Sequence, residues 1–282
     1  MTSVSQPVGV TGSTGHLGGR IARRLAARGI AQTLLVRDPS RAPALPNSTV
    51  ARAAFGDPEV VASALAGVRT VLMVSASESA DRVEQHRTFV DAAVAAGVRH
   101  LVYISFYGAA PDATFTLARD HYVTEQYIRA SGLSWTFLRD NLYADFLPGL
   151  VGADGVIRGP AGAGRVAAVA QDDIADAAAA VLADVDAHAG QTYSLTGPES
   201  LTLDEVAATL TEFTGRPVSY HDETVPEAYA SRASYGAPDW QLAAWVSTYT
   251  AIAAGEFATV TDDIRRLSGH PATSLAELLR RD

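Results

Sequence analysis

A run of glycines close to the N-terminus constrains the fold of this chain more than any other feature. Gly12, Gly15 and Gly18 lie within "TGSTGHLG", between the apolar stretch "PVGV" and the helix-like stretch "HLGGRIARRLAARG". A strand that turns sharply into a helix needs glycine for the turn, for the approach of a ligand to the backbone, and for contact between helix and strand. The N–H groups at the start of such a helix attract phosphate. The sequence therefore predicts a phosphate-binding loop made of Gly12, Ser13, Thr14, Gly15, His16, Leu17 and Gly18.

Strand-like and helix-like stretches alternate through the first half of the chain. Amphipathic stretches that predict helices separate a series of apolar stretches. These apolar stretches predict strands at 7–12, 32–37, 49–55, 69–75, 99–105 and 134–139. Strands that are apolar throughout and alternate with helices form a parallel sheet that is covered on both faces. We therefore expect an α/β protein with a Rossmann-like, doubly wound parallel sheet.

The alternation loosens after about residue 141. A Gly/Pro-rich stretch at 148–165 reads as loop with short strands, and helix-like stretches follow it. One of these begins with the capping box Thr202 to Glu205. We expect a nucleotide-binding domain over residues 1–141. Residues 142–282 are expected to form mainly a smaller C-terminal α/β substrate lobe, with some segments returning to the sheet.

Composition excludes several classes of protein. The 282 residues are 48% hydrophobic and 19% charged, as in an ordinary globular protein. A net charge of −9 argues against nucleic acid as a partner, because a phosphate-backbone binder needs a basic surface. The chain has no cysteine, and its histidines show no metal-ligand spacing, so no metal site is expected. We find neither a signal-peptide pattern nor an apolar stretch that could span a membrane, and we expect a cytoplasmic protein.

The residue that follows the second strand indicates which dinucleotide the loop binds. Arg37 comes directly after the apolar stretch 32–36, with Arg41 nearby. An acid at this position binds the ribose of NAD, whereas an arginine neutralises the 2′-phosphate of NADP. Arg37 thus predicts NADP(H), although an arginine here can also simply lie at the surface. Asp57 is a candidate for contact with the adenine amine, or is a plain helix start.

In these residues and in two longer segments, the chain resembles the NmrA-like, atypical short-chain dehydrogenase/reductases. The closest likeness is to their NADPH:quinone oxidoreductase and triphenylmethane reductase branch. The resemblance rests on Gly12 to Gly18, on Arg37, on "HYVTEQYIRASGLSWTFLRDNLYADF" (121–146) and on the tail "GEFATVTDDIRRLSGHPATSLAEL". It implies a Rossmann-like fold, NADP(H), and a substrate pocket between the C-terminal edge of the sheet and the small lobe. Some relatives bind the nucleotide as redox sensors.

The expected helix near residues 117–133 lacks the Tyr-x-x-x-Lys pair of short-chain dehydrogenases. All 22 basic residues are arginines, and the matching spacings give His121 with Glu125 and Tyr122 with Gln126. A ketone needs such a pair because hydride addition puts charge on one oxygen. A quinone, enone or conjugated dye gives a delocalised anion or a neutral product, so the enzyme mainly has to orient it. The missing lysine therefore favours conjugated or aromatic acceptors.

Candidate catalytic residues lie where the strands end and on this helix. They are Ser105, Tyr107, His121 and Asn141. Glu125 either orients His121 near the cofactor or forms a helix-surface pair with it. Ser105 and Asn141 can instead be structural, as can the small residues that would leave room for the second ribose, Ser75, Ala76 and Ser77. An aromatic helix with Trp240, Trp245 and Tyr249 is core, an oligomer face or a wall of the pocket.

These features together favour one function over another. We expect an NADPH-dependent reductase that transfers hydride to a quinone-like or other conjugated small molecule. The alternative is a non-catalytic NADP(H)-binding regulator that senses redox state. We expect a monomer or a homodimer.

Overall fold

The computed structural model describes residues 6–281. Residues 1–5 and 282 lie outside the described part. They include the start of the stretch without a signal-peptide pattern, the first residues of the expected nucleotide-binding domain and the last residue of the expected substrate lobe. The chain divides into two compact units, each built from several segments. Unit 1 contains Met1–Ser105, Asp120–Arg139 and Gln171–Tyr193, and unit 2 contains Phe106–Arg119, Asp140–Ala170 and Ser194–Asp282.

A seven-stranded sheet forms the centre of the fold and confirms the expected fold class. Its strand order is β3-β2-β1-β4-β5-β6-β9. The strands are β1 Val8–Thr11, β2 Gln32–Val36, β3 Ser48–Arg52, β4 Thr70–Val74, β5 His100–Phe106, β6 Ser134–Asp140 and β9 Thr192–Leu195. The pairs β1–β2, β2–β3, β1–β4 and β4–β5 are all parallel. The order reverses between β1 and β4, and ligands of such sheets bind at the carboxyl ends of the strands beside this reversal.

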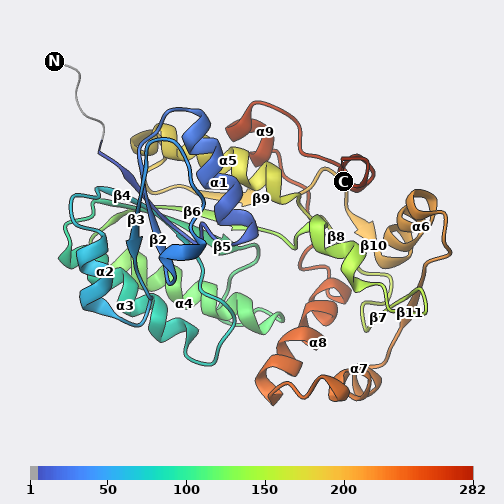
Figure 1. The fold of residues 1–282 in the computed structure, drawn as a ribbon. Coiled ribbons are helices and arrows are strands. Elements are labelled where there is room, and N and C mark those ends of the chain that lie inside the picture. Colours follow the sequence, from blue (N-terminus) through green and yellow to red (C-terminus); the bar gives the residue numbers. More distant parts are fainter. Residues whose placement is uncertain (1–5, 282) are drawn as a thin grey trace. The chain divides into compact units, whose positions relative to one another are not determined.

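Helices cover both faces of the sheet, as the alternation predicted (Figure 1). One face carries α1 (His16–Ala27) and α5 (Gln171–Ala183), and the other carries α3 (Arg82–Ala95) and α4 (Thr116–Ala130). The short helix α2 (Pro58–Ala64) packs beside α3. Ion pairs from Arg24 to Asp172 and Asp176 tie α1 to α5. The apolar residues of α1 at three- and four-residue spacing, Leu17, Ile21 and Leu25, are all buried against the sheet.

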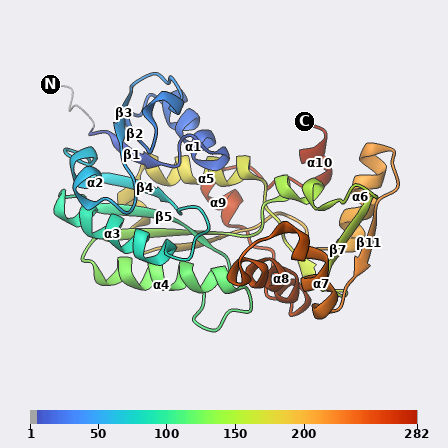
Figure 2. The ribbon, with the colours of Figure 1, turned by 60° about the horizontal axis from the view of Figure 1, so that its bottom comes forward.

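Unit 2 holds two small sheets and several helices (Figure 2). Strand β7 (Val156–Gly159) pairs in parallel with β11 (Ser219–Asp222), and β8 (Arg165–Val166) pairs antiparallel with β10 (Leu201–Thr202). The helices are α6 Leu203–Thr214, α7 Val225–Arg232, α8 Asp239–Ala253, α9 Asp263–Ser268 and α10 Leu275–Leu279. Short 3₁₀ turns occur at Pro39–Arg41 and Val185–His188 in unit 1, and at Ala144–Leu150 and Ala233–Tyr235 in unit 2.

The capping box predicted at the start of α6 is present. The Thr202 side chain accepts from the Glu205 backbone N–H, and the Glu205 side chain accepts from the backbone of Thr202. Helix α7 begins with a second box of the same kind, Thr224 with Glu227, which the sequence reasoning overlooked.

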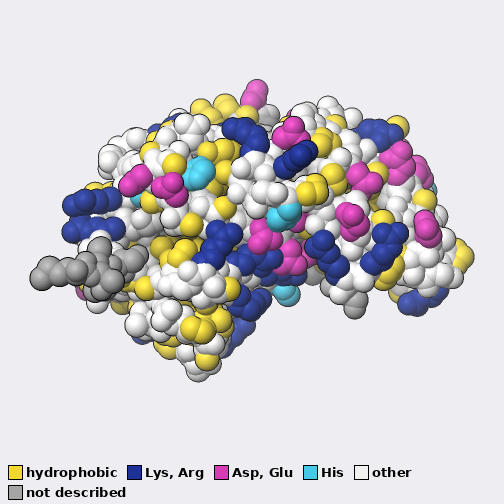
Figure 3. Space-filling model, turned by 90° about the horizontal axis from the view of Figure 1, so that it is seen from above, with side chains coloured by type: hydrophobic (Ala, Val, Ile, Leu, Met, Phe, Trp, Pro, Cys, Tyr) yellow, Lys and Arg dark blue, Asp and Glu magenta, His cyan; other side chains and the backbone are white. Residues whose placement is uncertain are grey.

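On the face shown in Figure 3, arginine and acidic side chains lie interspersed. Within residues 6–281, no helix is both long and apolar enough to cross a membrane.

Candidate functional site

The glycine loop has the backbone that its sequence predicted. Gly12 follows β1 directly with φ of 67°, a left-handed conformation that side chains disfavour. The Gly15 N–H donates to the Gly12 carbonyl oxygen over 2.9 Å and closes the turn. A Cβ at Gly18 would overlap the carbonyl oxygen of Gly12, so the helix approaches the strand as closely as only glycine allows. The roles assigned to Gly12 and Gly18 from the pattern therefore fit the structure.

The same loop contains a buried hydroxyl, that of Ser13, and several exposed backbone positions. The buried Ser13 hydroxyl oxygen has no hydrogen-bond partner among the described residues. Gly12, Thr14, Gly15 and His16 are exposed, whereas Leu17 and Gly18 are buried under the loop. A buried hydroxyl without a partner is unfavourable unless a ligand satisfies it. A hydroxyl beside the N-terminus of α1, with open backbone around it, fits a pyrophosphate.

The end of β2 presents Arg37 to solvent. Among the described residues, Arg37 makes no ion pair, so its guanidinium is available to a phosphate. The following acid is engaged locally, because Asp38 accepts from the Ser40 hydroxyl over 2.7 Å and from the Ser40 N–H over 3.0 Å. These two bonds lower the pKa of Asp38. Arg41 lies exposed at the end of the same 3₁₀ turn.

Asp57 starts α2. Its carboxylate accepts from the Val60 N–H over 3.1 Å as the N-cap, and the side chain is exposed. The structure therefore shows the helix-start role for Asp57. A contact of Asp57 with the adenine amine stays a prediction.

The loop after β4 is held by His86, a histidine to which the sequence assigned no role. The Ala76 N–H donates to Nε2 of His86 over 2.9 Å, and Nδ1 of His86 lies 2.9 Å from the Thr124 hydroxyl. Because Nε2 accepts, Nδ1 carries the proton and donates to Thr124. The Thr124 hydroxyl in turn donates to the Asp120 carbonyl over 2.8 Å. Burial, reinforced by the charge of Arg82, lowers the pKa of His86 to about 3, so this imidazole is neutral. It fixes the backbone of the loop that contains Ser75, Ala76 and Ser77.

Ser105 and Glu125 come together in the interior of unit 1. The Ser105 hydroxyl donates to the Glu125 carboxylate over 2.6 Å, and neither side chain is exposed. Arg139 donates two hydrogen bonds to the same carboxylate, over 2.8 and 2.6 Å. Two-point pairing with a guanidinium compensates the burial of this charge. The arrangement joins β5, α4 and β6 at the carboxyl end of the sheet.

His121 is buried as well, so the expected helix-surface pair with Glu125 is wrong. Its Nδ1 lies 2.9 Å from the Tyr103 hydroxyl, and only 7% of the residue is exposed. Burial lowers the pKa of His121 well below its ordinary value, and the nearby Arg82, His86 and Arg139 act in the same direction. His121 is therefore a neutral imidazole. The helical spacing placed both side chains on one face of α4 but did not reveal that this face is buried.

The other candidates at the ends of β5 and β6 belong to unit 2. The Asn141 amide donates to the Phe257 carbonyl over 3.0 Å and accepts from the Leu142 N–H over 2.8 Å. Tyr107 is partly buried against the apolar core of the unit. The Tyr143 hydroxyl donates to buried Asp140 over 2.9 Å. Burial raises the pKa of Asp140 well above its usual range.

Unit 2 contains a pocket of about 910 Å³. Its wall is mainly aromatic and aliphatic, with Tyr143, Phe146, Leu147, Leu150, Val156, Val166, Tyr235, Trp245, Tyr249 and Ile252 among the lining residues. The polar groups of the wall include Asp154, Arg158, Ser231, Arg232 and Thr248. Helix α8 thus contributes to the wall of a pocket, one of the roles considered for its aromatic residues. Few polar groups in an apolar cavity are typical of small-molecule sites.

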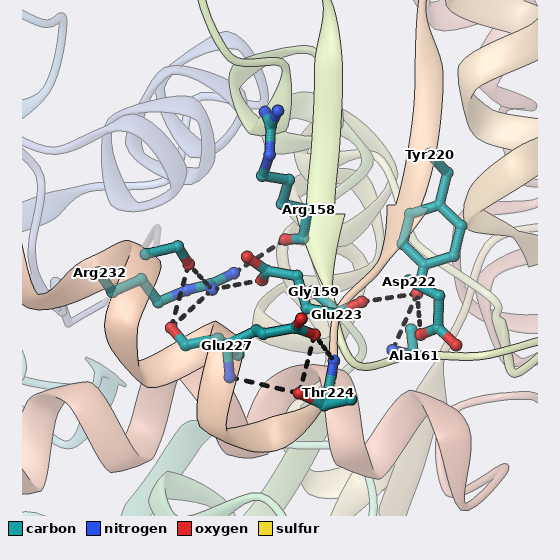
Figure 4. A network of polar contacts seen from close by, with 11 residues as sticks. Arg158, Gly159, Ala161, Tyr220, Asp222, Glu223, Thr224, Glu227 and Arg232 are labelled. Carbon is teal, nitrogen blue, oxygen red and sulfur yellow. Dashed lines mark hydrogen bonds and ion pairs between the residues drawn. The ribbon is translucent and has the colours of Figure 1, made fainter.

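A network of polar contacts lies beside this pocket (Figure 4). Arg232 at the end of α7 donates to the Glu223 carboxylate over 2.9 Å and to the Arg158 carbonyl over 2.8 Å. Tyr220 donates to the Gly159 carbonyl over 2.7 Å. Both members of the Arg232–Glu223 pair are buried.

Comparison with known proteins assigns the chain to a family. A family model described as NAD(P)H-binding matches residues 12–185. Quinone oxidoreductase 2 of Escherichia coli (strain K12) is 34% identical over 277 residues, which cover 96% of each chain. A crystal structure of NADPH-dependent quinone oxidoreductase from Escherichia coli, complexed with NADPH, superposes with a TM-score of 0.89 at 32% identity over 97% of this chain and 99% of that one.

A second solved structure gives the same result. The triphenylmethane reductase of a Citrobacter species, complexed with NADP(H), superposes with a TM-score of 0.86 at 31% identity over 97% of this chain and 99% of that one. The glycine loop, the orphan Ser13 hydroxyl and Arg37 agree with a dinucleotide site. The chain therefore belongs to the NAD(P)H-binding family and is an oxidoreductase similar to quinone oxidoreductase 2.

Proposed function

We propose that this oxidoreductase transfers hydride from NADPH to a quinone-like or other conjugated small molecule. The observation that supports this most is the aromatic pocket of unit 2. Its aromatic, apolar wall suits a planar ring system, since aromatic side chains stack on such rings. The lack of any lysine points the same way, because a conjugated acceptor spreads the charge that hydride brings. The quinone oxidoreductase and triphenylmethane reductase relatives carry names of conjugated substrates.

The residues of unit 1 would hold the cofactor. We assign the pyrophosphate to the loop from Gly12 to Gly18 and the 2′-phosphate to Arg37. NADPH supplies the hydride when bound. Around it, His86 fixes the loop of residues 75–77, and Arg139 holds the Glu125 carboxylate in place with two hydrogen bonds. The catalytic roles of Ser105, Tyr107, His121 and Asn141 remain predictions, as do a cytoplasmic location and a monomeric or homodimeric state.

A panel of acceptors tests the function. The purified protein is mixed with NADPH and, in turn, benzoquinone, naphthoquinone, an enone, a triphenylmethane dye and an unconjugated ketone, and the loss of NADPH absorbance is followed. We expect turnover of conjugated acceptors and none of the ketone. NADPH binding without turnover of any acceptor would contradict the proposal and favour a nucleotide-sensing regulator.

A further inference from the structure

Tyr249 occupies a fixed position in the wall of the unit 2 pocket. It lies on α8, and its ring rests directly on the backbone of Gly159 at the end of β7. A Cβ at Gly159 would overlap the ring, so the missing side chain is what admits it. Tyr249 also packs against the apolar core of the unit. The phenol therefore borders the cavity from a position that its neighbours determine.

A fixed cation lies beside this ring. The guanidinium carbon of Arg232 is 5.0 Å from the centre of the Tyr249 ring. Its donors are held by Glu223 at 2.9 Å, the Ala228 carbonyl at 3.0 Å and Ser231 at 3.0 Å. Figure 4 shows this guanidinium pointing towards the Glu223 carboxylate and the backbone carbonyl of Arg158. Arg232 lines the pocket whereas its ion-pair partner Glu223 does not, so the guanidinium is the nearer of the two charges to what the pocket holds.

A tyrosine beside a fixed cation can protonate the oxygen of a reduced acceptor, and so speed a step that a delocalised anion could otherwise leave to solvent. The usual pair of this kind, Tyr-x-x-x-Lys, is absent from the sequence. We propose that Tyr249, assisted by Arg232, donates a proton to the oxygen of a carbonyl-type acceptor such as a quinone in the unit 2 pocket. This proposal rests on the proposed function, because it names the group that completes the same reaction.

The protonation state of Tyr249 suits this role. Burial raises the pKa of its phenol, with smaller contributions from Glu223 and Tyr235, while the charge and hydrogen bonding of Arg232 oppose that rise. The phenol thus keeps its proton near neutral pH and gives it up only to a strong base, such as an oxyanion beside it.

The proposed step consumes one hydride and one proton. The acceptor gains two electrons and one hydrogen as hydride, and NADPH is oxidised to NADP⁺. The Tyr249 O–H bond breaks, and its proton forms an O–H bond on the acceptor oxygen. The resulting phenolate is stabilised by Arg232 and takes a proton from water. Arg232 is a positioning residue in this step, since it acts through Tyr249.

The test compares Tyr249→Phe with the parent on two acceptors. Naphthoquinone needs a proton on oxygen, whereas a cationic triphenylmethane dye becomes neutral on taking hydride and needs none. Loss of one hydrogen bond to a developing anion costs roughly ten- to a hundredfold. We expect kcat for the quinone to fall by roughly that factor relative to kcat for the dye. Rates in D₂O should show a solvent isotope effect for the parent with quinone that Tyr249→Phe loses.

Three controls make the outcome decisive. Tyr229→Phe makes the same change on an exposed tyrosine of α7 outside the pocket, and should behave as the parent. Circular dichroism and NADPH affinity show whether each variant is folded. Arg232→Lys keeps the charge but loses the planar fork, and should weaken quinone turnover in the same direction as Tyr249→Phe without abolishing the isotope effect.

The outcomes distinguish a wrong role for Tyr249 from a wrong proposed function. Equal loss on quinone and dye, or an isotope effect that survives in Tyr249→Phe, would overturn the role of Tyr249. A selective loss on quinone in Tyr143→Phe but not in Tyr249→Phe would move the donor to the Asp140–Tyr143 pair and overturn it too. A parent that reduces no acceptor would instead refute the proposed function itself.

Discussion

Protonation of buried His86 should make this protein unstable in mild acid. The perturbation is His86→Gln, because a glutamine oxygen can accept from the Ala76 N–H as Nε2 of His86 does. Glutamine does not titrate. The variant therefore keeps the acceptor while removing the group whose ionisation the fold opposes.

The magnitude follows from the pKa of His86. Folding lowers it from 6.5 to about 3. Below 6.5 the unfolded chain binds a proton that the folded chain refuses, so stability falls as pH drops from 6.5 towards 3. Each pKa unit corresponds to about 1.4 kcal/mol, so the parent should lose about 2 kcal/mol from this group alone between neutral pH and about pH 5. The full effect, near pH 3, is about 4–5 kcal/mol.

Urea unfolding followed by circular dichroism at several pH values measures this loss. The parent should approach or fall below the stability of His86→Gln as pH decreases, and the gap between them should narrow by about 2 kcal/mol between neutral pH and about pH 5. His221→Gln, at an exposed histidine, serves as the control and should keep the pH dependence of the parent. Parallel curves for the parent and His86→Gln would refute the assignment of His86 as a neutral, buried acceptor.

Three further substitutions test the cofactor site and the helix α4. Arg37→Ala removes a charged phosphate contact worth about 2–3 kcal/mol, so titration calorimetry should show weaker NADPH binding and unchanged NADH binding; equal weakening of both would contradict the role of Arg37. Gly18→Ala puts a Cβ onto the Gly12 carbonyl, and we expect this variant to lose nucleotide binding and to melt at a lower temperature. An NADPH affinity equal to that of the parent would show that helix α1 can shift to admit the Cβ. His121→Phe should retain most quinone turnover, since neutral, buried His121 is no acid; a loss above about a hundredfold in kcat with intact NADPH affinity would identify it as a general acid.

The parallel sheet was predictable because its signals are local. The Gly12 to Gly18 loop and the apolar strands each carry their own pattern, and the structure reproduces both. Unit 2 was harder, since its strands are two to four residues long and pair with distant segments. Helix α7 could have been found from Thr224 and Glu227, which form the same capping signal that revealed α6.

The contacts of the site were less predictable than its location. Spacing put His121 and Glu125 on one helix face, but their partners Tyr103 and Arg139 come from β5 and β6. Likewise, nothing near His86 in the sequence points to the Ala76 backbone ten residues earlier. Such partners depend on how strands and helices pack in space, which periodicity does not encode.

The most direct test of the proposed function is the stoichiometry of the reaction. The purified protein is incubated with NADPH and limiting naphthoquinone without oxygen, and NADP⁺ and the hydroquinone are both quantified. The account predicts equal amounts of NADP⁺ and hydroquinone, formed at a rate proportional to the protein concentration. NADP⁺ without hydroquinone, or neither product despite saturated NADPH binding, would contradict it.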